Sequence, residues 1–135
     1  MKKLLSLFLL IAAASFLMNS LLFAADTRAK APMVVYLAPN DESTVDLSGK
    51  ATLRFEWKSQ PIPGGGREAY KITIYKGFGY DKIAGETVNP QTFYIDIPAE
   101  KFEDGVTYSW HVEQRDAGSR QWSRFESWSF KVTKK

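Results

Sequence analysis

Apolar and polar residues alternate along most of the chain after residue 32, in short runs that are separated by turn residues. The run from Thr52 to Lys58 shows this most clearly, because Leu53, Phe55 and Trp57 alternate with Arg, Glu and Lys. A period of two is typical of a β-strand that buries one face and exposes the other. The spacing of the runs therefore predicts an antiparallel β fold.

Seven runs of this kind can be distinguished, and no segment has a convincing helical period. The predicted strands cover residues 33–37, 52–58, 70–75, 83–88, 93–97, 106–114 and 128–132. Ala99 to Glu103 has room for one helical turn, and Asp116 to Ser119 is predicted to be a hairpin turn. We expect an all-β fold, a seven-stranded antiparallel β-sandwich.

The segment from Phe102 to Val112 is the most informative one for the fold. Phe102 precedes Tyr108 by six residues with Gly105 between them, and Tyr108, Trp110 and Val112 then alternate. This pattern predicts a tyrosine corner, in which the ring enters the core and its hydroxyl group binds the preceding turn.

These motifs together resemble the fibronectin type III family, in the broad sense that includes bacterial exported modules. The matching residues are Phe55-Glu-Trp57, Tyr70-x-Ile72-x-Ile74-Tyr75, the corner itself, Trp122-Ser123 and Ser129-Phe130-x-Val132, within about residues 33 to 133. Immunoglobulin-like domains without a disulfide share the pattern, and the glycine-rich loop from Ser59 to Glu68 departs from it. The resemblance implies a sandwich used as a spacer, an adhesion module or a ligand binder, and it does not choose among them.

The first 24 residues are predicted to be a signal peptide. Lys2 and Lys3 precede an apolar run from Leu4 to Met18, and cleavage after Ala24 fits the small residues there. An uncleaved N-terminal anchor is the alternative, because Leu4 to Phe23 approaches the length of a membrane span. Residues 25–32 are then a linker and residues 33–135 the domain, and we expect a bacterial secreted or periplasmic protein with no membrane contact after cleavage.

Composition narrows the classes of partner. Loss of Lys2 and Lys3 with the signal peptide lowers the formal charge from +3 to +1, so a nucleic-acid partner is not expected. The chain has no cysteine, and stability must come from a core rich in Trp, Phe and Tyr.

No catalytic, metal-binding or cofactor-binding motif is evident, so we expect a protein that is not an enzyme and needs no cofactor. Gly64-Gly65-Gly66 leads into a strand and not into a helix, which favours a flexible loop over a phosphate cradle. His111 is the only histidine, and its strand position predicts that it faces solvent without a nucleophile or second ligand nearby.

Aromatic residues outside the predicted core are the only lead to function. Phe78 and Tyr80 lie in a loop with flanking glycines, Tyr75 and Tyr94 lie on the outer rows of their strands, and Trp122 precedes the last strand. Exposed rings bind protein partners or stack on sugars. We expect a non-catalytic exported module for protein or cell-surface polymer binding, with a small carbohydrate-binding domain as the alternative. Cation–π stacking on Trp122 is predicted from Arg115, Arg120 or Arg124.

Overall fold

The computed structural model describes residues 31–62, 66–117 and 120–135. Within this part of the chain the fold is all-β, with eight strands and one short 3₁₀ turn. The elements are β1 (Val35–Ala38), β2 (Ser43–Asp46), β3 (Thr52–Lys58), β4 (Arg67–Lys76), β5 (Asp81–Val88), β6 (Tyr94–Pro98), η1 (Ala99–Lys101), β7 (Thr107–Asp116) and β8 (Trp128–Thr133). The predicted signal peptide, most of the linker and Gly64, Gly65, Gly118 and Ser119 lie outside the described residues.

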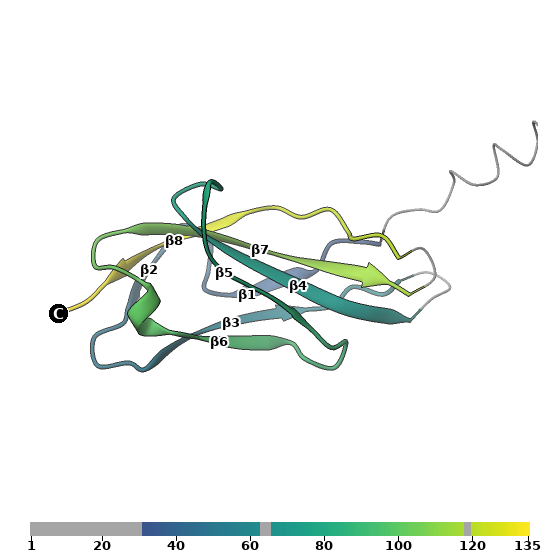
Figure 1. The fold of residues 1–135 in the computed structure, drawn as a ribbon, viewed down its shortest axis with the longest axis horizontal. Helices are drawn as coiled ribbons and strands as arrows, with labels where there is room; N and C mark the ends of the chain where they lie inside the picture. The colour runs from purple at the N-terminus through teal and green to yellow at the C-terminus, as the bar shows by residue number, and fades with distance from the viewer. Residues whose placement is uncertain (1–30, 63–65, 118–119) are drawn as a thin grey trace, which may run out of the picture.

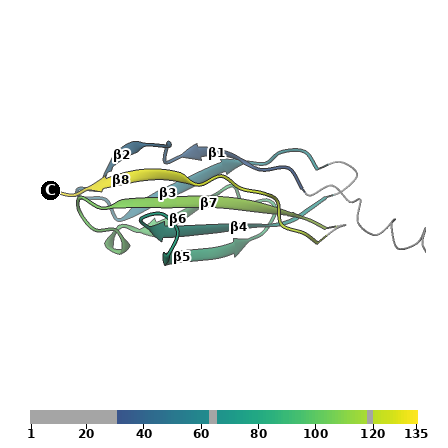
Figure 2. The ribbon, with the colours of Figure 1, turned by 90° about the horizontal axis from the view of Figure 1, so that it is seen from above.

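The strands form two sheets that lie one above the other (Figure 1). One sheet has three strands in the order β1-β3-β6, and the other has five in the order β2-β8-β7-β4-β5. Figure 2 shows the five-stranded sheet from its outer side. Because each strand alternates apolar and polar residues, the apolar rows of both sheets meet between the layers in a sandwich-type arrangement.

The prediction of seven antiparallel strands is wrong in two respects. The chain has an eighth strand, β2, and β2 pairs parallel with β8 (Val45 opposite Val132). Β1 belongs to the other sheet, so the chain passes from one sheet to the other between β1 and β2, through the cis peptide bond of Ala38–Pro39. Strand β2 was missed because Val45 is the one large apolar side chain among its four residues. A single apolar position does not distinguish a strand from the turn that precedes it.

The core is built mainly from aromatic rings. Phe55 from β3 contacts Trp110 from β7 with ring centroids 5.1 Å apart, so the two sheets meet through these side chains. Trp110, Tyr108 and Phe55 are each completely buried. The tyrosine corner is confirmed, because the Tyr108 hydroxyl accepts a hydrogen bond of 2.7 Å from the backbone N–H of Glu103.

One buried polar residue joins segments that are far apart in sequence. Gln114 on β7 is inaccessible to solvent, and its amide donates hydrogen bonds to the carbonyl groups of Pro32 (2.7 Å) and Gln60 (3.3 Å). This single side chain on β7 therefore holds both the segment before β1 and the loop after β3.

Among the described residues there is no helix long and apolar enough to cross a bilayer.

Candidate binding surface

The turn between β4 and β5 projects beyond the outer face of the five-stranded sheet (Figures 1 and 2). It is held at its base, because the N–H of Gly77 donates to the carbonyl of Thr107 (2.9 Å) and the Ser109 hydroxyl donates to the carbonyl of Gly77 (2.7 Å). Gly77 and Gly79 have φ angles of 69° and 108°, which residues with a side chain adopt only with strain. The glycines thus allow a tight tip on an anchored base.

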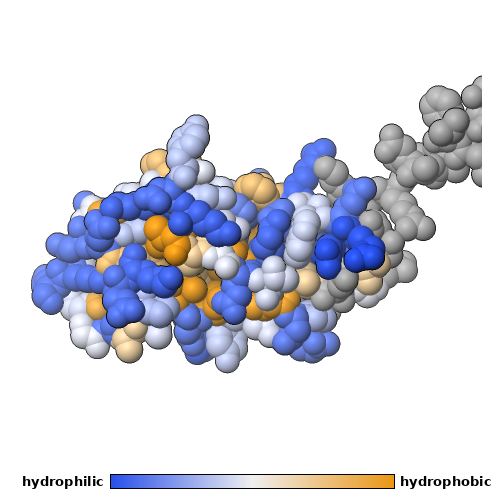
Figure 3. Space-filling view, in the orientation of Figure 1, coloured by the Kyte–Doolittle hydropathy of each residue, from blue (hydrophilic) through white to orange (hydrophobic). Residues whose placement is uncertain are grey.

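Phe78 and Tyr80 are the most exposed large hydrophobic residues among those described. Phe78 is 74% exposed and Tyr80 is 101% exposed, so neither ring has a role in the core. The space-filling view shows the hairpin tip standing out from the surface (Figure 3). The two predicted contact residues in this loop are therefore presented to solvent together.

The prediction that His111 faces solvent is wrong. His111 does lie on the outer row of β7, but it is only 5% exposed, because the ring of Phe125 stacks on it with centroids 3.7 Å apart and planes 13° apart. The ring of Tyr75, on the neighbouring strand β4, has its centroid 5.9 Å from that of His111. The alternation of apolar and polar residues within β7 shows which side chains point outward. It does not show that the segment between β7 and β8 covers them.

A small charged cluster lies beside His111. Lys71 on β4 pairs with Glu113 on β7 at 2.9 Å, and the Nε2 atom of His111 is 3.7 Å from the same carboxylate oxygen of Glu113. Burial lowers the pKa of His111 below its usual value and Lys71 acts in the same direction, against the opposing effect of Glu113. His111 is therefore a neutral, buried imidazole at neutral pH. Its Nδ1 atom has no hydrogen-bond partner among the described residues.

Trp122 lies on this same outer face, with two cations over its ring. The Nζ atom of Lys71 is 4.6 Å from the ring centroid and the guanidinium carbon of Arg115 is 5.0 Å away. The predicted stacking is confirmed for Arg115, and Lys71 is a partner that the sequence did not indicate. The half-buried Trp122 ring thus already has cation–π partners within the domain.

Tyr94 lies apart from the other predicted contact residues. It begins β6 in the three-stranded sheet, is 48% exposed, and has the Arg54 guanidinium 4.1 Å from its ring centroid. Arg54 is fixed there by two hydrogen bonds of 2.9 Å to Asp96. Tyr94 therefore belongs to a separate, internally paired cluster.

The five predicted contact residues thus fall into three groups: the tip with Phe78 and Tyr80, the outer face with Tyr75 and Trp122, and Tyr94 on the other sheet. Lys71, Glu113 and Phe125 complete the outer face, and sequence reasoning missed them. Lys71 and Glu113 have outward positions on neighbouring strands, which become visible only when the pairing of β4 with β7 is known. Phe125 lies in the segment between β7 and β8, and no strand pattern indicates its position. Residues 31–62, 66–117 and 120–135 hold no cluster of three His, Asp or Glu residues suited to a metal ion.

Comparison with known proteins supports the fold and leaves the family open. No protein-family model matches the chain, and no curated protein sequence is similar to it. The chain is similar to part of an α-L-rhamnosidase from Dictyoglumus thermophilum, with a TM-score of 0.58 and 16% identity over 78% of this chain and 13% of the rhamnosidase. It also aligns with CopC from Methylosinus trichosporium OB3b, with a TM-score of 0.47 and 14% identity over 75% of this chain and 94% of CopC.

The first of these likenesses supports a sandwich-type β fold. At this level of identity it carries no information on ligand or activity. The chain spans 13% of the length of the rhamnosidase.

Proposed function

We propose that this chain is a non-catalytic exported module, of the fibronectin type III-like class, that binds a protein partner through the tip of the β4–β5 hairpin. The observation that carries the proposal is the exposure of Phe78 and Tyr80, at 74% and 101%, on a turn whose base is anchored to β7. Aromatic side chains have few rotatable bonds, so rings on an anchored turn lose little conformational freedom on binding, and such rings dominate interface energies.

The tip favours a protein partner over a sugar for a chemical reason. Phe78 has no polar atom on its side chain, and an apolar ring is best accommodated in an apolar pocket. The other rings suited to sugar stacking are Trp122, Tyr75 and Tyr94. Trp122 and Tyr94 have cations over their faces, and the Tyr75 ring centroid lies 5.9 Å from that of His111. The carbohydrate-binding alternative therefore ranks second, because its platforms are already engaged within the domain.

The test is site-specific photo-crosslinking from the tip. A benzophenone amino acid in place of Tyr80 is expected to give a discrete cross-linked species with a periplasmic protein. Excess unlabelled wild-type domain is expected to compete for it, while the double variant Phe78→Ala, Tyr80→Ala does not. Tyr94→Ala is the matched control, since it also removes an exposed ring and is expected to compete like wild type.

Competition by the double variant that equals the wild type contradicts the proposal. Both tip rings are exposed, so the double variant is expected to keep its melting temperature, with a change in stability within about 0.5 kcal/mol. Affinity electrophoresis on bacterial and plant polysaccharides tests the carbohydrate alternative directly. Retardation that survives the tip substitutions, and that is lost on Trp122→Ala, favours that alternative.

Export is a further part of the proposal, and it rests on residues 1–24. The predicted cleavage after Ala24 gives a mature chain that begins at Ala25. Mass spectrometry of the protein from the periplasmic or culture fraction tests it. A full-length chain that sediments with membranes supports the uncleaved anchor instead.

A further inference from the structure

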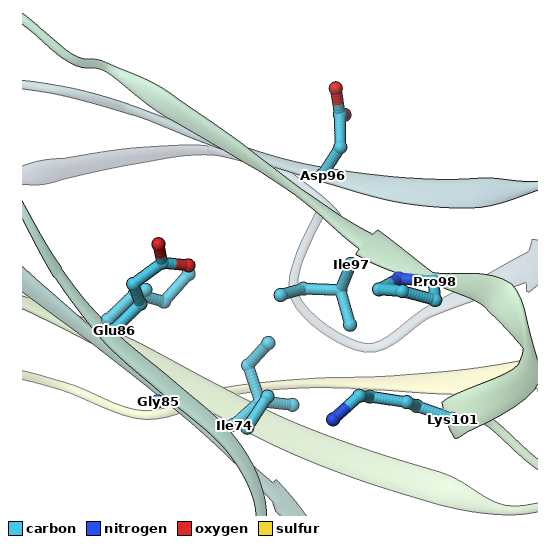
Figure 4. Close-up of a pocket in the computed structure, with 9 residues that line it drawn as sticks. Ile74, Gly85, Glu86, Asp96, Ile97, Pro98 and Lys101 are labelled. Carbon is cyan, nitrogen blue, oxygen red and sulfur yellow. The ribbon is translucent and has the colours of Figure 1, made fainter.

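Each of the two sheets ends in strands that have a neighbour on one side only. These edge strands are β1 and β6 in the three-stranded sheet, and β2 and β5 in the five-stranded sheet. A free edge exposes unpaired backbone groups, and natural proteins often protect it with charged residues. Strand β5 contains Asp81, Lys82 and Glu86, β6 contains Asp96, and β2 contains Asp46. Figure 4 shows Glu86 and Asp96 projecting from the edges of β5 and β6.

Strand β1 lacks this protection. Among the strands that the structure describes, it is the only edge strand without a charged residue, and Met33 and Val34 before it are also apolar. Its outward row consists of Met33, Val35 and Leu37, which are 37%, 39% and 48% exposed. Within the described part of the chain, its backbone makes no hydrogen bond outside the ladder with β3. Figure 2 shows β1 on the flank opposite β5, where this apolar edge is open to a further strand.

The inner side of the same edge also has space. A hollow of about 130 Å³ lies between β1 and the start of β8, lined by Glu126 and Trp128 on one side. Val34 and Tyr36, the inward-facing residues of this edge, line the other side. A strand that pairs with β1 therefore has room for its own inward side chains.

The charges beside β1 change sign from its start to its end. At the start, Lys58 pairs in register with the first residue of β1, and Arg124 lies beside the segment that leads into it. Neither of these cations forms an ion pair with another described residue. At the end, Glu56 pairs in register with the last residue of β1, and Glu42 follows in the next turn. Glu126 lies between the two ends.

We propose that β1 pairs with β1 of a second copy of this chain, in antiparallel orientation, about a two-fold axis near Tyr36. This register places Val35 of one copy opposite Leu37 of the other, so apolar side chains meet in the outward row. It also brings the basic start of each strand beside the acidic end of its partner, whereas parallel pairing brings like charges together. The contact uses the same surface on both copies, so it closes as a dimer.

The pairing joins two three-stranded sheets into one sheet of six strands. The hairpin tip belongs to the other sheet, so both tips stay exposed in the dimer. The inference is therefore independent of the protein-binding proposal, and each can fail without the other.

The first test is sedimentation equilibrium of the mature chain, residues 25–135, over a range of concentrations. We expect a reversible monomer–dimer equilibrium with a Kd on the order of 100 µM, because a strand of four residues buries little area. Val35→Lys is expected to weaken it at least tenfold, since a lysine on an edge strand opposes pairing. Tyr80→Lys is the matched control, because it also replaces an exposed ring or chain by lysine, and it is expected to associate like wild type. The melting temperature of each variant verifies that it is folded.

The second test concerns orientation and register. Lys58→Glu is expected to weaken the dimer several-fold by making both ends of β1 acidic, while Lys131→Glu, the same change on the outer side of β8, is expected to leave it unchanged. The chain has no cysteine, so single cysteines report on neighbours directly. Oxidation of an equimolar mixture of Val35→Cys and Leu37→Cys is expected to give more of the mixed disulfide than of the two symmetric disulfides together. Mass spectrometry distinguishes the three products.

Three outcomes overturn the proposal. The first is a chain that stays monomeric at all concentrations up to about 1 mM, well above the expected Kd. The second is association that Val35→Lys leaves intact and Tyr80→Lys abolishes, which assigns the contact to the hairpin tip. The third is a predominance of the symmetric disulfides, which excludes the register about Tyr36.

Discussion

The hydroxyl group of Tyr108 makes one hydrogen bond in the corner, to the N–H of Glu103 at 2.7 Å. Tyr108→Phe keeps the ring in its place against Phe102 and Phe130 and removes only that bond. We expect a loss of about 1 kcal/mol in the free energy of unfolding, since the Glu103 N–H is left with a weaker partner. Urea denaturation with an unchanged m-value measures it. A loss above about 3 kcal/mol contradicts this account, because it requires a change in packing.

His111 gives the domain a pH dependence of known sign. Its pKa in the folded state is lowered, chiefly by burial under Phe125, so the unfolded chain takes up a proton first as the pH falls. Stability is therefore full above the unfolded pKa of about 6.5 and decreases as the pH falls below it toward the folded value. The charged groups that face His111 are Lys71 and Glu113, whose effects on its pKa are opposite.

The measurement is the free energy of unfolding at about pH 7.5 and about pH 5.5, in wild type and in His111→Gln. We expect the wild type to lose more stability than the variant across this interval, because glutamine does not titrate. Carboxylates with lowered pKa values, Asp46 and Asp96, act at lower pH and are common to both proteins. An equal loss in the two proteins contradicts the assignment of this step to His111.

At the scale of the element, the segment that covers His111 is held by Tyr36 of β1. The Tyr36 hydroxyl donates to the carbonyl of Glu126 at 2.6 Å and accepts from the N–H of Val112 at 3.2 Å. Burial raises the pKa of Tyr36 to about 12, so the group remains a donor at neutral pH. One side chain therefore joins β1, β7 and the segment that carries Phe125.

Tyr36→Phe is expected to lower the free energy of unfolding by about 1–2 kcal/mol, as both bonds are lost. In the variant, the rate of amide hydrogen exchange is expected to increase over wild type more for Arg124 to Ser127 than for the rest of the domain. In wild type the raised pKa also means that the unfolded chain loses this proton first, so stability falls as the pH rises from about 10 toward 12. Uniform exchange rates in the variant contradict the role of Tyr36 as the tie of this segment.

The elements that the sequence predicts well are those whose own residues contain the full pattern. Β3 was predicted with its observed bounds, because Leu53, Phe55 and Trp57 alternate with charged residues over all seven positions. Β2 and the burial of His111 could not be predicted in the same way. Β2 owes its pairing to β8, and His111 owes its burial to Phe125, so each depends on a contact across 14 residues or more.

At the scale of the whole molecule, the hairpin tip depends on local sequence, whereas the outer face of the five-stranded sheet depends on contacts between distant residues. The exposure of Phe78 and Tyr80 follows from local chemistry, since flanking glycines make a tight turn with no neighbour to cover the rings. The pairing of Trp122 with Lys71 depends on the register of β4 with β7, which no local pattern shows. The open edge of β1 depends on which strands end the two sheets, a property of the complete topology.

The two sheets share one core, so they are expected to unfold together. Trp110 from the five-stranded sheet contacts Phe55 from the three-stranded sheet and Tyr36 from β1, with centroids 5.1 and 4.8 Å apart. Trp110→Ala leaves a large cavity at this junction and is expected to lower stability by about 3–5 kcal/mol, a large share of the total for a domain of this size. Far-UV and near-UV circular dichroism during urea denaturation measure the secondary and tertiary structure. We expect both transitions to move to lower urea and to remain superimposed, whereas two separated transitions in wild type contradict a shared core.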